Sequence, residues 1–262
     1  ENEEETIKLI EEALDRVDYL SAGYGVEYGR AMGGIVGVWT RKPDRDRLKG
    51  FAYADLINAG AAVEMPVGEK GSLTLGFRRS YIGEVLKAAQ KSKKDDKDDN
   101  ADLTAAPTFT DFTAVYDTPM TDVDDFRLVF VASQDSLGFV LKDPPENDPK
   151  IRGNFESKTS FVRLIPEWTH RHGDATTSRF SLGLGRDWIK FILDYQFFRL
   201  YLYTLTQRYS LERKWSESFA STFGLDNSFG WAKVALNFPD FYTAGGVGNP
   251  VSTGEQRRVG IS

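Results

Sequence analysis

From residue 48 onward, hydrophobic and polar side chains alternate with a period of two. Leu73, Leu75 and Phe77 alternate with polar or small neighbours, and comparable alternation recurs near residues 180 and 205. Because successive side chains of a β-strand point to opposite faces, this period predicts strands with one apolar face. We predict nine strands, at residues 48–58, 60–67, 71–83, 107–118, 125–140, 159–171, 176–191, 196–214 and 218–238.

The start of the chain has a different period. Ile7, Ile10, Leu14 and Val17 recur at steps of three and four residues with glutamates between them, which predicts a short amphipathic helix. The glutamates at its start suit the positive end of a helix dipole. A glycine-punctuated stretch follows from Tyr19, ends in an apolar run at 35–39, and leads through a charged hinge into the first predicted strand.

Strand length and the links between strands favour a bilayer-spanning barrel over a soluble sandwich. Several predicted strands are longer than the five or six residues typical of soluble sheets and reach the length that a tilted strand needs to cross a bilayer. Short turns, as at 68–71 and 172–175, alternate with long links, as at 84–106 and 141–158. Outer-membrane barrels separate short periplasmic turns from long outward loops in this way. We therefore predict an all-β fold, an antiparallel transmembrane β-barrel with nine strands visible.

Composition narrows the function classes. The chain of 262 residues has no cysteine, which excludes disulfides and thiolate metal sites. A net charge of −6 without a basic stripe argues against nucleic acid as a partner. The sequence contains no run of about 18 apolar residues, so it predicts no transmembrane helix. The acidic residues 1–5 are unlike the basic start of a signal peptide, so we expect a mature or truncated form of an exported protein.

Two stretches resemble the end of the plug domain of TonB-dependent outer-membrane receptors. They are ALDRVDYL at residues 13–20 and YGVEYGRAMGGIVGVWTRKP at 24–43, directly before the first predicted strand. The plug motif consists of Tyr28, Gly29, Arg30, Gly33 and Gly34, and its glycines suit a close approach of backbone to the barrel wall. The stretch 21–23 departs from the family's usual Arg-Gly-Pro, and a glycine at position 37 replaces a common asparagine.

The resemblance implies two parts: residues 1–47 form the C-terminal part of a plug domain, and residues 48–262 form the N-terminal part of the barrel. Family barrels have about 22 strands, so nine imply a fragment or an incomplete barrel. The implied function is uptake of a scarce ligand, such as a siderophore, cobalamin, a saccharide or a peptide. The implied setting is the bacterial outer membrane, with the lipid bilayer, lipopolysaccharide and a TonB-type periplasmic protein as partners.

Two other function classes remain open. One is a structural or docking subunit of an envelope assembly that keeps the receptor fold without import. The other is an outer-membrane enzyme, although the sequence has no cysteine nucleophile and no serine in a G-x-S-x-G turn. We expect no enzymatic activity and no cofactor.

Charged residues within the predicted strands suggest two interpretations. Five arginines fall on or near the phase that faces the barrel lumen: Arg78, Arg127, Arg163, Arg179 and Arg208. We expect them to pair with acidic lumen or plug residues. The alternative is attraction of an anionic ligand.

Two clusters contain residue types that metal sites use. His170 and His172, with Asp174 nearby, occur at a predicted periplasmic turn and lack an adjacent third soft ligand; we expect surface residues there. The stretch 91–102 has calcium-like acidic spacing, but Ala101 and Pro107 replace the required glycine and glutamate. We expect a solvated outer loop at that position.

Overall fold

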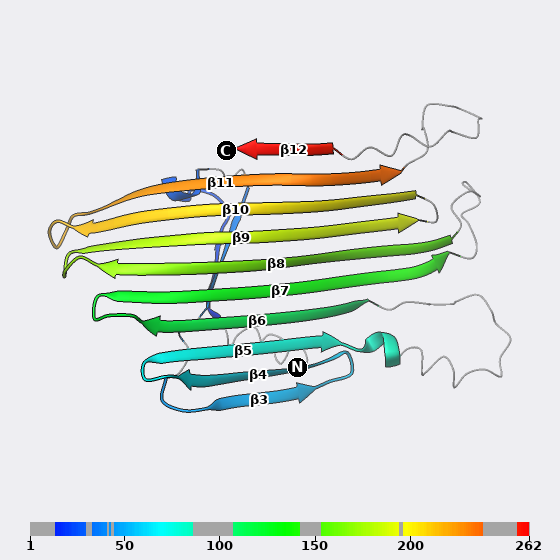
Figure 1. The fold of residues 1–262 in the computed structure, drawn as a ribbon, viewed down its shortest axis with the longest axis horizontal. Coiled ribbons are helices and arrows are strands. Elements are labelled where there is room, and N and C mark those ends of the chain that lie inside the picture. Colours follow the sequence, from blue (N-terminus) through cyan, green and yellow to red (C-terminus); the bar gives the residue numbers. More distant parts are fainter. Residues whose placement is uncertain are drawn as a thin grey trace.

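The computed structural model describes residues 14–29, 33–40, 42, 45–85, 107–141, 153–193, 196–237 and 256–261. Two antiparallel sheets account for the strands in these ranges. The smaller sheet pairs β1 (Leu14–Leu20) with β2 (Ile35–Thr40). The larger sheet has ten strands in the order β12-β11-β10-β9-β8-β7-β6-β5-β4-β3, so each strand pairs with its neighbours in sequence (Figure 1).

The strands of the larger sheet are longest from β7 to β11. Strands β7, β9 and β11 have 18 residues each, and β8 and β10 have 19. The bounds are β3 (Lys49–Ala54), β4 (Asn58–Val67), β5 (Gly71–Ser80), β6 (Thr108–Pro119), β7 (Asp124–Leu141), β8 (Gly153–Arg171), β9 (Thr176–Leu193), β10 (Gln196–Lys214), β11 (Ala220–Asn237) and β12 (Gln256–Ile261). In the described chain the sheet is open, with β3 and β12 at its edges.

All nine strands predicted from the period of two correspond to β3 through β11. The structure adds β12, at positions 256–261, after residue 238, where the sequence pattern predicts no strand. It also starts β8 at Gly153, six residues before the predicted start. Links at one end of the sheet are short, at 68–70, 120–123, 172–175 and 215–219, whereas the strand ends at the opposite side are joined by the longer stretches 81–107, 142–152 and 238–255. Links 55–57 and 194–195 at that second end are short.

The predicted N-terminal helix is wrong where the structure describes it. Leu14 and Val17 belong to strand β1, whereas Ile7 and Ile10 lie outside the described residues. The reason is the pairing with β2, in which Val17 lies opposite Val38. Cross-strand contacts of this kind override the preference of a short isolated helix, which is marginal in water.

Helical structure in the described residues is limited to two single turns. One is the 3-10 turn η1 (Val26–Tyr28), and the other covers residues 82–85 after β5. In the described part of the chain, no helix has the length and apolar character needed to cross a membrane.

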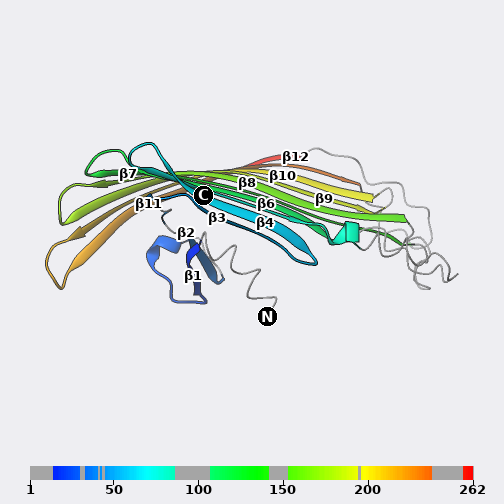
Figure 2. The ribbon, with the colours of Figure 1, turned by 90° about the horizontal axis from the view of Figure 1, so that it is seen from below.

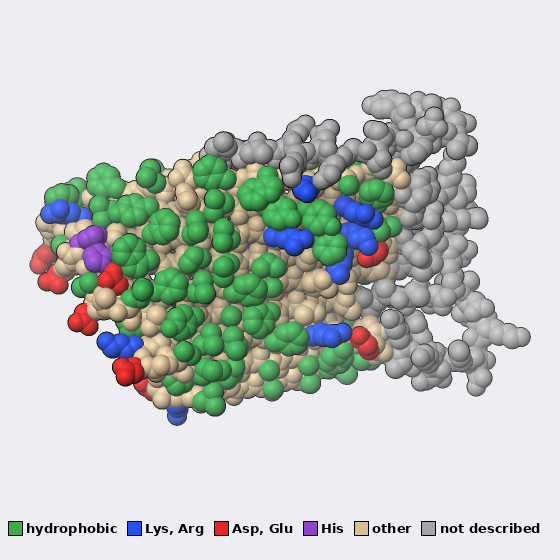
Figure 3. Space-filling view, viewed as in Figure 1, with side chains coloured by type: hydrophobic (Ala, Val, Ile, Leu, Met, Phe, Trp, Pro, Cys, Tyr) green, Lys and Arg blue, Asp and Glu red, His purple; other side chains and the backbone are tan. Residues whose placement is uncertain are grey.

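The strand register sorts side chains into an apolar and a polar face. One row of register partners on the apolar face contains Phe126, Trp168, Phe180, Tyr209 and Leu225. A second row, four residues along each strand, contains Phe130, Leu164, Leu184, Leu205 and Phe229. Figure 3 shows this face, where hydrophobic side chains are spread across the sheet.

The described residues bury polar side chains and expose apolar ones, the reverse of the pattern in a soluble domain. Among the described residues, Val115 is the one hydrophobic side chain in the fully buried class, whereas Glu64, Ser72 and Asp117 are polar and buried. Large apolar side chains remain exposed, including Trp168 at 43% and Leu225 at 68%. Exposed apolar surface of this extent indicates an interaction with lipid or protein.

Candidate functional site

The two-stranded sheet β1–β2 lies beneath the concave side of the larger sheet (Figure 2). This side carries the polar set of the alternating pattern. Two polar contacts connect the segment around β2 to it. Arg127 on β7 donates from Nη2 to the carbonyl oxygen of Thr40 at 2.7 Å, and Arg45 forms an ion pair with Asp117 at 2.6 Å.

A third contact involves the predicted plug motif itself. Tyr28 ends the turn η1, and the guanidinium carbon of Arg208 on β10 lies 5.7 Å from the centre of its ring. Tyr28 also packs edge-to-face on Tyr24, with ring centroids 6.2 Å apart. The motif therefore contributes an aromatic surface that a cation of the large sheet covers.

The other motif residues have different surroundings. Gly29 follows η1, and Gly33 and Gly34 directly precede β2, while Arg30 lies outside the described residues. A Cβ added at Gly34 would lie 3.1 Å from the ring of Tyr19, whereas at Gly33 it would meet no atom within 4 Å. The close approach at Gly34 is thus to β1, within the two-stranded sheet.

Acidic residues pair with three of the five predicted lumen arginines. Arg78 donates from Nε to Asp111 at 2.9 Å, and Asp111 also accepts from Ser133 at 2.7 Å. On the longer strands, Arg163 pairs with Asp187 at 2.6 Å and Arg208 with Asp226 at 2.8 Å. Pairing with acids, the first of the two interpretations, is therefore what the structure shows for these three.

The partner acids do not follow from the sequence pattern. The cross-strand neighbours of Asp187 and Asp226 depend on the register between strands. That register places Arg208 directly opposite Asp226. The polar phase of each strand was visible in the sequence, but the offset between strands was not. Arg45 and Thr40 were likewise missed, because their partners are 72 and 87 residues away.

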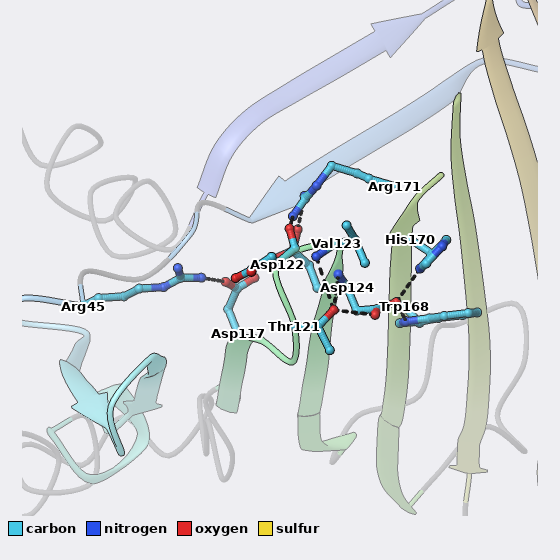
Figure 4. A network of polar contacts seen from close by, with 10 residues as sticks. Arg45, Asp117, Thr121, Asp122, Val123, Asp124, Trp168, His170 and Arg171 are labelled. Atoms are coloured by element: carbon cyan, nitrogen blue, oxygen red, sulfur yellow. Dashed lines mark hydrogen bonds and ion pairs between the residues drawn. The ribbon is translucent and has the colours of Figure 1, made fainter. Parts of the chain in front are cut away.

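The β6–β7 turn forms a second polar network, at the short-link end of the sheet (Figure 4). Thr121 donates to Asp124 at 2.6 Å, His170 Nδ1 lies 2.7 Å from Asp124, and Trp168 donates to it at 3.0 Å. Hydrogen bonds from Thr121, and next from His170, hold the pKa of the Asp124 carboxyl below its usual range. Arg171 pairs with Asp125 at 2.6 Å and joins the turn to β8.

The two histidines lie together at this end. Their ring centroids are 4.3 Å apart, and His172 Nε2 lies 3.0 Å from Ser178 Oγ. Within the ranges that the structure describes, no three His, Cys, Asp or Glu side chains are grouped to hold a metal ion. The stretch 91–102, with its calcium-like acidic spacing, lies outside those ranges.

Comparison with known proteins gives a match at the level of structure. No family model matches the chain, and no curated protein matches it. Among solved structures, the chain is similar to the ferric-catecholate import receptor Fiu from E. coli K12 in an open form, with a TM-score of 0.57 and 10% sequence identity. The match covers 95% of this chain and 56% of that receptor. At this identity the likeness shows a similar fold, and function has to be argued from the site.

Proposed function

We propose that this chain is part of an outer-membrane receptor that imports a scarce ligand with energy supplied by a TonB-type periplasmic protein. The observation that carries the proposal is the placement of β1–β2 on the polar side of an amphipathic sheet. In this arrangement residues up to 47 are the end of a plug and residues from 48 onward are barrel wall. The likeness to an iron-chelate importer supports the same assignment.

The apolar stretch of β9 has the number of residues that a tilted strand needs to cross a bilayer core. From Phe180 to Trp188, β9 spans nine residues, which at about 3.3 Å per residue covers about 26 Å along a strand. Tilted membrane strands cross with 9–11 residues and carry an apolar band about 25 Å tall, flanked by aromatic girdles. Trp168 and Phe180 lie opposite each other at one border of this band, and Trp188 and Tyr201 lie opposite each other at the other border.

The contacts that hold the plug segment suit a part that moves. Arg127–Thr40 and Arg45–Asp117 are polar, and because water can take the place of either partner, each contributes at most about 1.5–3 kcal/mol. A large apolar interface would hold the segment more permanently. A plug that opens under force from a periplasmic partner requires the first kind of contact.

The ligand proposed for this chain is an iron chelate, cobalamin, a saccharide or a peptide. The matched receptor imports a ferric catecholate, which places iron chelates first among the compounds to test. The arginines that pair with Asp111, Asp187 and Asp226 are neutralised locally. We therefore expect ligand selectivity to come from outward loops rather than from these cations.

The test is a gene deletion in the native host, complemented with the intact gene product that contains this chain. Uptake of labelled iron chelates, cobalamin, oligosaccharides and peptides is measured with and without a protonophore, and the protein is located by membrane fractionation. Outer-membrane location and one ligand whose uptake needs both the gene and the proton gradient would support the proposal. Outer-membrane location without any dependent ligand would favour a docking subunit, and a protein outside the membrane fraction would overturn the proposal.

A further inference from the structure

A cluster of basic side chains interrupts the apolar face near the long-link end of the sheet. In Figure 3 it belongs to the blue group at the side where β8, β9 and β10 approach those links. We call it the basic girdle, and it consists of Lys158, Arg186, Lys190 and Arg199. Register places Lys158 opposite Lys190 and Lys190 opposite Arg199, so three cations lie side by side on three strands.

Aromatic rings hold these cations in place. Trp188 stacks on Tyr201 with centroids 6.0 Å apart, and the Lys158 ammonium lies 5.2 Å from the Trp188 ring. Arg186 lies 5.7 Å from the rings of both Tyr201 and Tyr203. Cations against ring faces are partly desolvated but remain charged.

The acidic side chains beside the basic girdle do not offset all of its positive charge. In the described strands, one acidic side chain on this face lies near the basic girdle. It is Glu156, which pairs with Lys190 at 2.9 Å. Like charges directly opposite each other on neighbouring strands repel. Four cations beside one carboxylate therefore favour an anion from outside the chain.

The position of the basic girdle identifies the kind of anion. Lys190 lies two residues beyond Trp188, the border of the apolar band, toward the long links. Long links of outer-membrane barrels face outward, so this level corresponds to the head groups of the outer leaflet. Three strands spaced by about 4.8 Å spread the row of cations over about 10 Å, which suits a head group with more than one phosphate.

We propose that the basic girdle binds the phosphate groups of outer-leaflet lipopolysaccharide, an inference that rests on the proposed membrane location. Arg199 provides a guanidinium group that matches phosphate oxygens, and Lys158 and Lys190 provide point charges. Arg186 lies two residues inside the border at Trp188, and its guanidinium carbon lies 5.7 Å from the ring of Tyr201, the register partner of Trp188. Its long side chain can therefore bring a cation to the border from inside the band. The acyl chains then lie along the apolar rows below, over Leu184 and its neighbours. The chemical feature that the basic girdle recognises is a bisphosphorylated head group joined to hydrocarbon chains.

The test compares a double variant with a matched control in the intact gene product, purified in detergent from a lipopolysaccharide-containing host. The variant is Lys158→Gln with Arg199→Gln, and the control is Arg213→Gln with Lys214→Gln at the opposite end of β10. Native mass spectrometry measures retained lipopolysaccharide. Because each charge pairs only weakly with a phosphate at a hydrated surface, removal of both should reduce the retained lipid about tenfold, whereas the control should retain the wild-type amount.

A second measurement needs no variant. Wild-type protein is melted with added bisphosphorylated lipid A, dephosphorylated lipid A or phosphatidylglycerol. A rise in Tm with the first lipid alone supports the proposal. Equal retention by the double variant, or equal stabilisation by phosphatidylglycerol, overturns it. Failure of the proposed function is seen separately, as a protein that does not fractionate with the outer membrane.

Discussion

Arg127 on β7 donates two hydrogen bonds from one nitrogen to Thr40 at the end of β2, at 2.7 Å to the carbonyl and 2.5 Å to the hydroxyl oxygen. The two residues are 87 positions apart in the chain. The contact joins the two sheets at the point where the chain passes from one to the other. A charged donor with two acceptors on one residue fixes both the position and the direction of β2.

Replacing Arg127 by leucine should loosen β2 from the larger sheet. Hydrogen bonds to charged groups contribute about 1.5–3 kcal/mol, so local opening of residues 35–40 should become more frequent by roughly one to two orders of magnitude. Amide hydrogen exchange of that segment measures the change. Arg127→Lys, which keeps a charged donor, is the matched control and should show a smaller effect. Unchanged protection in the leucine variant would contradict the role assigned to this contact.

The ion pair between Arg45 and Asp117 should act as an independent second contact. Asp117 is 4% exposed, whereas Arg45 remains partly exposed. We therefore expect a coupling free energy of about 1 kcal/mol, closer to a surface pair than to a buried one. A double-mutant cycle with Arg45→Leu and Asp117→Leu measures it from urea unfolding in lipid vesicles. Additive effects of the two substitutions would show that the pair contributes nothing.

The alternating strands were predictable because their pattern is local. Tyr201, Tyr203 and Leu205 reveal both a strand and its apolar face without knowledge of any partner. The face pattern also indicated which side carries the charges. Strand β1 was not predictable in this way, because the spacing of Leu14 and Val17 fits a helix and only pairing with β2 decides against it.

The sites depended on information that spacing alone does not contain. Arg208 was placed on the polar phase, but its partner Asp226 follows from the register of β10 with β11. The basic girdle was missed for the same reason, since Lys158, Lys190 and Arg199 are far apart in sequence and become neighbours only across three strands. Register is fixed by turns and by the buried face together, so a single strand does not reveal it.

The β6–β7 turn should weaken in acid. The pKa of Asp124 is lowered in the folded chain, first by Thr121 and then by His170, relative to about 3.9 in an unfolded chain. The ionised carboxylate therefore contributes stability that is present above about pH 4 and is lost as the pH falls through the lower, folded-state pKa. Carboxyl NMR of Asp124 should give a midpoint below the usual value.

Thr121→Val tests the cause of this shift. It removes the hydrogen bond of 2.6 Å from Thr121 to Asp124, and the NMR midpoint should move back toward the unfolded value. The stability difference between wild type and Asp124→Asn should also shrink as the pH is lowered toward the folded-state pKa. An identical midpoint with and without the Thr121 hydroxyl would contradict the assignment.

Charged substitutions on the apolar face test whether this face lies in the hydrocarbon layer of a membrane. Leu184 lies in the middle of the apolar band and is 43% exposed in the isolated chain, so in water an arginine there would be tolerated. In a bilayer, Leu184→Arg should lower the free energy of unfolding by about 2–4 kcal/mol, because a cation at the midplane loses its hydration. Ile192→Arg, on the same face and strand but at the long-link end, should cost only about 0–1 kcal/mol. Urea unfolding in phospholipid vesicles measures both variants, and equal costs at the two positions would place this face outside the hydrocarbon layer.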